Sequence, residues 1–318
     1  MSIDEAISKN AYFAILVLPT QFDANRSPIS FNLVDGEMLN ASRTITLDLA
    51  PFAPYSGNSP QAETAREDHS QTIHAALAAI DSGSLEKVVI SCIKHAPRSH
   101  QSLDAIFNKL KEQYTGAMVY VLHHPEYGTW MGATPELLLR KMNHSFHTVS
   151  LAGTQKYAEN REMIWNDKLK REQSLVTDFI LQNIAHIGAT DICTDGPFTA
   201  QAGPLAHLKT DIHFTSVAST DDIILQLQPT PAVCGLPREN ALRFIQENSN
   251  SLRRLYAGRI GLCYNTGDEI HFVNLRCMQV YSDHFEIHVG GGIVAGSTPE
   301  DEWHETEIKA NVLRNLLH

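Results

Sequence analysis

Short segments rich in β-branched and aromatic residues recur along most of this chain, and helical patterns separate them. Such segments, bounded by turn residues, are typical of strands, whereas apolar residues that repeat every three or four positions are typical of helices. No internal repeat, low-complexity tract or clear interdomain linker interrupts the succession. Clusters of strands with interspersed helices predict an α+β fold, built as a single large domain over residues 1–318.

The expected strands are "AYFAILVLP" (11–19), "LEKVVISCI" (85–93), "AMVYVLHH" (117–124), "ELLLRK" (136–141), "FHTVSLAGT" (146–154) and segments near 210–217, 258–264, 270–281 and 284–289. The expected helices are 71–83, stopped by Gly83, then 103–114, 165–187, 238–247 and 299–317. The stretch "YGTWMGATP" (127–135) carries turn residues and is expected to connect two strands.

The charge balance narrows the range of partners. The formal net charge is −11, so neither nucleic acid nor an anionic membrane is expected as a main partner. A small anionic substrate stays open, because a few local cations can override the overall field. Residues 11–19 are too few to cross a bilayer and lack a basic lead-in and a cleavage site. The five cysteines form no CxxC motif, and their odd number predicts reduced, structural thiols in a cytoplasmic protein.

The terminal helix carries charges on the face that should be apolar. Thr298 is a suitable N-cap, and Glu300 and Asp301 favour the positive end of the helix dipole. At about 100° per residue, however, three further charged side chains continue the stripe of Val312 and Leu313 toward the interior. These three are Glu302, Glu305 and Lys309.

The helix expected over 165–187 shows the same arrangement, because Glu172 shares a face with Leu169, Val176 and Phe179. Two helices therefore direct glutamates inward, and buried carboxylates need a cation or a hydrogen-bond network. Oxygen-only ligands suit a hard cation such as Mg²⁺. Buried Glu–Lys ion pairs without a metal are the alternative.

The segment "VGGGIVAG" (289–296) resembles a dinucleotide-binding fingerprint, but its context does not fit. Only about 26 residues follow Gly292, too few for the rest of a doubly wound domain. A glycine turn that presents backbone N–H groups to a carboxylate is expected, or a plain tight turn.

Eight segments, in order from about residue 70 to the C-terminus, together resemble the chorismate-utilising enzymes and, within them, the isochorismate synthases. They are "LEKVVIS", "GATPELLLRK", "SLAGT", "KLKREQSLV", "QPTPAVCGLPRE", "RRLYAGRIG", "VNLRC" and "GGGIVAGSTPEDEWHETEIK". The resemblance implies the fold of ADC synthase, the fold of chorismate-utilising enzymes, with two stacked β-sheets flanked by helices. Residues 70–318 would form the catalytic core, and residues 1–60, which match poorly, a strand-rich N-terminal part.

The resemblance also implies roles for individual residues. Lys87 matches the general base that activates water at C2 of chorismate, for which it must lose its proton. Glu136 matches the general acid that protonates the departing C4 hydroxyl, so an apolar site that raises its pKa is expected. Glu172 and Glu305 match ligands of Mg²⁺, with Glu302 supporting the ion through water. The implied substrate-binding residues are Ala152, Gly153 and Thr154 around the ring, and Tyr256, Arg276, Gly290, Gly292 and Lys309 at the carboxylates.

Lys87 also separates the subclasses. The resemblance implies glutamine at this position in ammonia-using synthases, so lysine indicates water as the nucleophile. Ala152 stands where aminodeoxychorismate synthases have a nucleophilic lysine. The implied activity is Mg²⁺-dependent conversion of chorismate to isochorismate. A salicylate synthase, which goes on to eliminate pyruvate, is the alternative, followed by an anthranilate-type synthase and a non-catalytic chorismate binder.

Three residues depart from the family pattern: Cys92 replaces arginine, and Gln173 and Gln228 replace histidine. They bear on substrate affinity more than on the chemistry. The implied setting is cytoplasmic, with chorismate as partner and no nucleic acid, membrane or obligatory protein partner, in menaquinone or siderophore biosynthesis.

Overall fold

The computed structural model describes residues 2–9, 11–34, 37–40, 43–49, 52, 57–98, 100–157, 163–202, 205–249 and 251–317. The helices are α1 (Ile3–Ser8), α2 (Arg66–Asp81), α3 (Leu103–Gln113), α4 (Asp167–His186), α5 (Thr220–Leu227), α6 (Arg238–Asn248) and α7 (Pro299–Arg314). The strands are β1 (Phe13–Val17), β2 (Ile29–Val34), β3 (Glu37–Asn40), β4 (Arg43–Asp48), β5 (Lys87–Pro97), β6 (Met118–His124), β7 (Gly128–Thr134), β8 (Leu137–Met142), β9 (Ser145–Lys156), β10 (Thr190–Ala202), β11 (Leu205–Thr215), β12 (Gly235–Leu236), β13 (Arg259–Tyr264), β14 (Glu269–Val273), β15 (Cys277–Val280) and β16 (His284–Val294).

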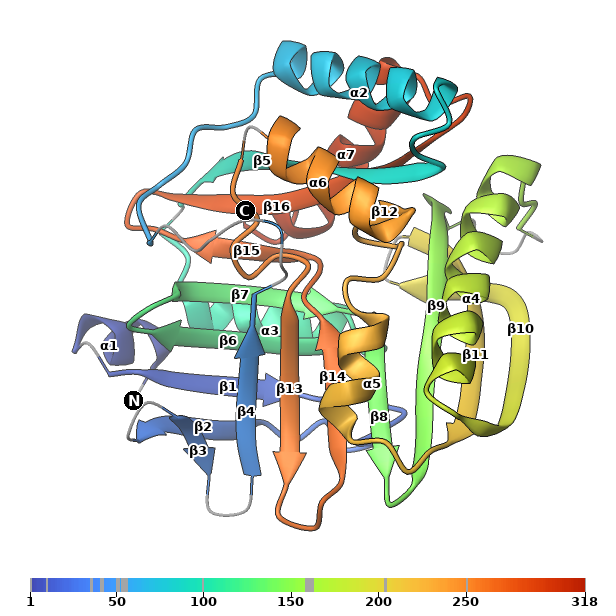
Figure 1. Ribbon diagram of the computed structural model, residues 1–318. Helices are drawn as coiled ribbons and strands as arrows, with labels where there is room; N and C mark the ends of the chain where they lie inside the picture. The colour runs from blue at the N-terminus through green and yellow to red at the C-terminus, as the bar shows by residue number, and fades with distance from the viewer. Residues whose placement is uncertain are drawn as a thin grey trace.

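The described strands form one antiparallel ladder in the order β10-β11-β9-β8-β14-β13-β4-β3-β2-β1-β6-β7-β15-β16-β5-β12. Figure 1 shows that the ladder folds into two halves whose strands cross. β1, β6, β7, β15, β16 and β5 run across the view, while β4, β13, β14, β8, β9 and β11 run up and down. The main core contains Leu16 and Tyr120 from the first half together with Ile260 and Phe272 from the second. The predicted α+β fold with two stacked sheets is confirmed, and hydrogen bonding joins the two sheets into one ladder.

The N-terminal strands make that join. β1 pairs with β6 in the first half, and β4 pairs with β13 in the second. β2 and β3 lie between them in the ladder. The strand-rich N-terminal part, whose role the sequence left open, therefore links the two halves.

Helices cover the outer faces of both halves (Figure 1). A second core cluster lies under α3 and α7, where Ile106 and Leu313 belong to the same cluster as Val121 and Ile287 of the first half. α4 packs on β9, and its Val176 lies in the main core. The apolar stripes expected on these helices account for this placement.

The start of α7 follows the sequence prediction. Thr298 Oγ1 accepts a hydrogen bond from the Asp301 amide at 3.2 Å and caps the helix. Glu302 is only 1 % exposed, so at least one glutamate of this helix points inward as expected.

Three local predictions were wrong. Gly290, Gly291 and Gly292 lie inside strand β16, and the turn follows at Gly296, whose φ is +85°. Residues 127–135 contain strand β7, which pairs with β6 and β15. The strand expected over 270–281 is divided into β14 and β15, because Arg276 between them has a φ of +48°.

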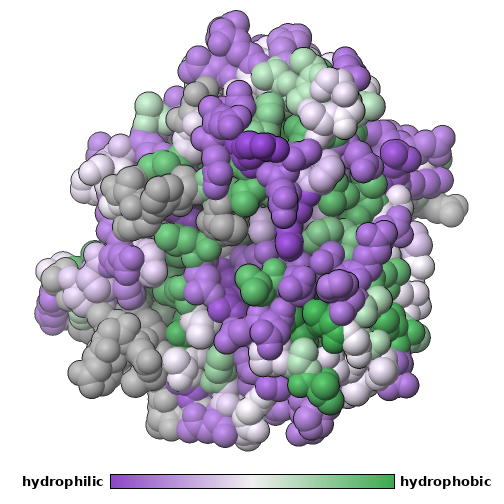
Figure 2. Space-filling view, viewed as in Figure 1, coloured by the Kyte–Doolittle hydropathy of each residue, from purple (hydrophilic) through white to green (hydrophobic). Residues whose placement is uncertain are grey.

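Hydrophilic residues form a band across the middle of the face in Figure 2, and apolar residues appear there as separate patches. Across the described ranges, no helix has both the length and the apolar character that a bilayer span requires. All five cysteines are free thiols; Cys92, Cys234 and Cys277 are buried, whereas Cys193 is exposed.

Candidate active site

A cavity lies between β9 of one half and the glycines of β16 in the other. Most of the residues expected at the site line this cavity. These lining residues are Glu136, Ala152, Gly153, Thr154, Glu172, Tyr256, Arg276, Gly290, Gly292 and Lys309. The other three expected residues do not line the cavity. Lys87 contacts the lining residue Glu172, Glu305 contacts the lining residue Lys309, and Glu302 lies next to Gly291 of β16.

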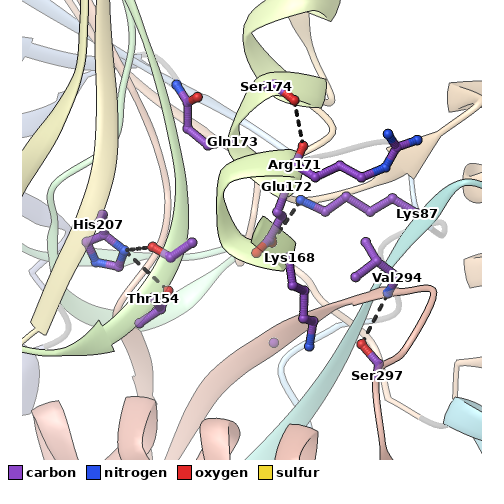
Figure 3. Close-up of polar contacts among 12 residues, drawn as sticks. Lys87, Thr154, Lys168, Arg171, Glu172, Gln173, Ser174, His207, Val294 and Ser297 are labelled. Atoms are coloured by element: carbon purple, nitrogen blue, oxygen red, sulfur yellow. Dashed lines mark hydrogen bonds and ion pairs between the residues drawn. The ribbon is translucent and has the colours of Figure 1, made fainter. Parts of the chain in front are cut away.

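Lys87 opens strand β5 and is completely buried. Its ammonium donates a hydrogen bond to Glu172 Oε1 on α4 at 3.0 Å, as Figure 3 shows. Burial alone would raise the pKa of Glu172, but Lys87, Lys309 and Lys168 together hold that pKa below its ordinary value. The fully buried lysine of β5 and the partly buried glutamate of α4 thus form an ion pair at the cavity wall.

Each of the three glutamates expected to bind a metal holds a lysine. Glu302 Oε1 is 3.0 Å from Lys168 Nζ, and Glu305 Oε1 is 2.6 Å from Lys309 Nζ. In the described part of the chain, the groups of ligand atoms that lie within 4.8 Å of one another do not include these three carboxylates. The Glu–Lys ion pairs that the sequence analysis gave as the alternative to a metal site are therefore present in this structure.

The glycines of β16 leave space next to these carboxylates. A Cβ added at Gly291 would lie 3.0 Å from Glu302 Oε2, and one added at Gly292 would lie 2.5 Å from Glu172 Oε1. Glu302 Oε2 is buried and has no hydrogen-bond partner among the described residues. Burial and the nearby Glu305 raise the pKa of Glu302. The carboxylates of Glu172, Glu302 and Glu305 offer only oxygen donors, and one of these oxygens has no partner among the described residues. Beside the glycines of β16, this set of donors fits a hard divalent cation.

Glu136 lies between β7 and β8, immediately before β8, and is 5 % exposed. Its backbone oxygen accepts from the Val273 amide at 3.0 Å, which fixes the residue at the end of β14. Burial raises the pKa of the Glu136 carboxyl to about 7, although Lys87, Arg276 and Lys309 oppose the shift. The side chain can therefore hold a proton near neutral pH.

His207 of β11 is a lining residue that the sequence analysis missed. Burial and the neighbouring Arg276 lower its pKa to about 3, so the imidazole is neutral. Its Nδ1 lies 3.0 Å from the Gly153 backbone oxygen, and its Nε2 lies 3.2 Å from an Arg276 guanidinium nitrogen. Since guanidinium only donates, Nδ1 carries the proton and Nε2 accepts from Arg276. No nearby motif marks a histidine in "LAHLKT" as a site residue.

Lys309 and Tyr256 both approach Gly290 in the glycine strand. Lys309 Nζ donates to the Gly290 oxygen at 2.8 Å. A Cβ at Gly290 would lie 2.8 Å from the Tyr256 hydroxyl oxygen, so glycine is required for this approach. Lys168, which the sequence analysis also missed, lies one helical turn before Glu172 and could have been found from that spacing.

Two of the family departures have a physical account. Gln173 donates to Ser150 Oγ at 3.2 Å, to Thr177 Oγ1 at 2.9 Å and to Thr210 Oγ1 at 2.8 Å, so its amide is satisfied behind the cavity. Cys92 belongs to the core cluster under α7 and does not line the cavity. The side-chain nitrogen of Gln228 is buried without a partner among the described residues, and nothing in the structure explains this substitution.

The chain belongs to the chorismate binding enzyme family, whose model matches residues 20–318. The match begins well before residue 60, so it includes much of the N-terminal part that joins the two halves.

Curated relatives and solved structures agree with this assignment. The chain is 32 % identical over 277 residues to "Isochorismate synthase MenF" of Escherichia coli K12, covering 80 % of this chain and 62 % of that protein. It is 28 % identical over 271 residues to "Isochorismate synthase DhbC" of Bacillus subtilis, covering 79 % of this chain and 68 % of that protein. The structure of E. coli MenF, titled as menaquinone-specific, superposes with a TM-score of 0.73 at 28 % identity and covers 83 % of this chain and 63 % of that chain. The chain thus spans about six tenths of the length of E. coli MenF.

A solved anthranilate synthase component I from Streptococcus pneumoniae has a TM-score of 0.70 at 21 % identity, covering 85 % of this chain and 61 % of that chain. At this identity the likeness concerns the fold alone.

Proposed function

We propose that this protein is an isochorismate synthase that adds water at C2 of chorismate and removes the hydroxyl at C4. The observation that carries the proposal is the pairing, at one cavity, of a fully buried lysine with a buried glutamate whose pKa is raised to about 7. This exchange of hydroxyl groups needs one group that accepts a proton and a second group, in a different environment, that donates one.

In the proposed reaction, Lys87 takes a proton from water as the water oxygen bonds to C2. Glu136 gives a proton to the C4 hydroxyl as its C–O bond breaks and the ring double bonds shift. One water enters and one leaves, so the atoms balance. A lysine must first lose its proton to act as the base.

Glu172, Glu302 and Glu305 would hold Mg²⁺ in the proposed enzyme. The ion would supply a positive charge that binds a substrate carboxylate and orients the ring. Lys168 and Lys309 hold Glu302 and Glu305 by ion pairs in this structure.

Arg276 would bind the other substrate carboxylate. His207 holds its guanidinium from one side, and the buried Tyr256 lines the same cavity. Ala152 and Gly153 of β9 line the cavity and would contact the ring.

A product assay tests the proposal directly. Purified protein is incubated with chorismate and Mg²⁺, with and without ammonia, and the products are separated by chromatography. Isochorismate alone supports the proposal. Salicylate with pyruvate would identify a salicylate synthase, an aminated product would identify an ammonia-using synthase, and unchanged chorismate would identify a binding protein.

The relatives include synthases named for menaquinone and for vibriobactin, so the proposal covers the isochorismate step that both routes share. A cytoplasmic setting is part of the proposal. No obligatory protein partner is proposed, because chorismate and water are the only reactants.

A further inference from the structure

A second cluster of titratable side chains lies on β5 and β16, away from the glycines. The strand register places His95 directly opposite Glu286, and His284 lies two residues from Glu286 on the same face. One ligand atom from each of these three residues lies within 4.8 Å of those of the other two. At 3.3 Å per residue, Glu286 is about 13 Å along the strand from Gly290, so this cluster is separate from the candidate active site.

His284 is held with one ring nitrogen free for a ligand. Its Nδ1 is 2.8 Å from Asp283 Oδ1, so this nitrogen carries the proton. Its Nε2 is buried, has no hydrogen-bond partner in the described part of the chain and lies 3.8 Å from Glu286 Oε1. A neutral imidazole fixed by an acceptor at one nitrogen, with the other directed at a carboxylate, is the usual state of a metal-binding histidine.

His95 is fixed in a similar way. Its Nε2 is 2.9 Å from the backbone oxygen of Gln61, which can only accept, so Nε2 carries the proton and Nδ1 keeps its lone pair. The ring centroids of His95 and His284 are 4.6 Å apart. Two rings at this separation can bind one ion.

Glu286 supplies the charge of the cluster. Its side chain is 0 % exposed. Arg254 lies 3.6 Å from Oε2, and the Gln61 amide donates to Oε1. Arg254 and the Tyr281 hydroxyl, which donates at 3.5 Å, therefore hold Oε2, while Oε1 accepts from the Gln61 amide and also faces His284.

We propose that His95, His284 and Glu286 bind a transition-metal ion of the Zn²⁺ or Ni²⁺ type, independently of the active site. Two imidazoles and one carboxylate select such ions over Mg²⁺. With bonds of about 2.0–2.2 Å, ligands of a tetrahedral ion lie about 3.4 Å apart, so the 3.8 Å gap needs only a small side-chain movement. Because Gln61 contacts both His95 and Glu286, the ion would also fix the segment before α2 against the sheet.

The test is calorimetric titration of Zn²⁺ into chelator-treated full-length protein, with saturating Mg²⁺ present to occupy the carboxylates of the active site. His284→Gln and His95→Gln should each weaken Zn²⁺ binding at least tenfold and leave turnover of chorismate unchanged. The matched control is His213→Gln, which alters the other close histidine pair, His147 and His213, stacked at 4.2 Å. The control should leave Zn²⁺ affinity unchanged. Circular dichroism checks that each variant is folded, and either of the two ligand variants suffices for the test.

Unchanged Zn²⁺ affinity in both ligand variants would overturn the proposal. So would loss of binding in Cys263→Ser, which alters the other cluster of metal-binding residue types, Cys263, Glu269 and His271. Co²⁺ distinguishes the two clusters independently, since only a site with Cys263 would give a thiolate charge-transfer band. That second cluster is the weaker candidate, because Glu269 already accepts hydrogen bonds from Lys141 and Thr220 and lies 3.0 Å from His271 Nε2.

Discussion

Glu136 is a carboxyl group that its surroundings keep protonated to an unusually high pH. If it is the general acid, the rate must fall as pH rises through about 7, where the carboxyl ionises. We expect Glu136→Gln to lower kcat by about 10²–10⁴-fold, the usual contribution of a general acid, and to remove this basic limb. The pH profile of kcat measures both effects. An unaltered limb in the variant would assign the ionisation to another group.

The same shift affects stability. The folded protein binds the Glu136 proton more tightly than the unfolded chain, whose carboxyl has the ordinary value of 4.5. Stability is therefore lost as pH rises from 4.5 through about 7. The effect of Glu136→Gln on the free energy of unfolding should therefore be more favourable above pH 7 than in acid. The difference should be up to about 3 kcal/mol, at about 1.4 kcal/mol per pKa unit. Urea unfolding on both sides of this window measures the difference.

Lys87 distinguishes an enzyme from a binding protein. Lys87→Gln removes the base but keeps a hydrogen-bond donor toward Glu172, so the fold and chorismate binding should persist. We expect turnover to fall by about 10²-fold or more, while chorismate affinity changes only a few-fold. Stopped assays of product and calorimetry of chorismate binding give the two numbers. Undiminished turnover would remove Lys87 from the mechanism.

His207 positions Arg276 and does not contribute a proton of its own. His207→Phe keeps the ring but removes the acceptor for the guanidinium, a charge-assisted bond typically worth about 1.5–3 kcal/mol. KM for chorismate should rise about tenfold or more, with a smaller change in kcat, and His207→Asn should restore part of the affinity. A fall in kcat at constant KM would instead indicate a role in the chemical step.

At the scale of elements, the glycines of β16 leave space for the side chains of Glu172 and Lys87. Gly292→Ala places a methyl group 2.5 Å from Glu172 Oε1 and 3.0 Å from Lys87 Cε. The carboxylate must move, so we expect Mg²⁺ affinity to fall at least tenfold together with turnover. Gly116→Ala is the control, because its Cβ meets nothing within 4 Å and should change neither quantity. Calorimetric titration with Mg²⁺ measures the affinity directly.

The sequence predicted long, periodic elements better than short or unusual ones. The inward direction of Glu302 followed from the wheel, because a helix with an apolar stripe has one orientation on its core. β7 was missed because Gly128 and Gly132 weaken its strand pattern. In the structure, the strands on both sides, β6 and β15, supply its pairing. The glycine run of β16 was read as a turn, since only the tertiary structure reveals the side chains that approach it.

Contacts across the two halves of the ladder were beyond the sequence. His207 and Arg276 are 69 residues apart, and Lys87 and Glu172 are 85 residues apart. The resemblance to the family placed Lys87, Glu172 and Arg276 at one site, but no periodicity in the sequence relates such distant positions.

For the whole molecule, the joined halves predict one cooperative unit. Phe31 of β2 is 1 % exposed and lies in the main core with residues from both halves. Phe31→Ala should lower the free energy of unfolding by about 3–5 kcal/mol, as is usual for a deleted core aromatic side chain. Tryptophan fluorescence and far-UV circular dichroism should still report one coincident transition. Two separate transitions would instead show that the N-terminal part unfolds on its own. Leu225→Ala, at a position 68 % exposed, is the control and should be nearly neutral.

The cavity lies where strands from the two ends of the ladder come close together. β9 is near one end of the strand order and β5 near the other, and the Lys87–Glu172 ion pair joins β5 to the helix that packs on β9. A ligand held there bridges strands that almost the entire hydrogen-bonded ribbon separates. Its binding free energy is therefore added to the stability of the complete molecule, and occupancy by substrate should protect even remote strands from proteases that attack the unfolded chain.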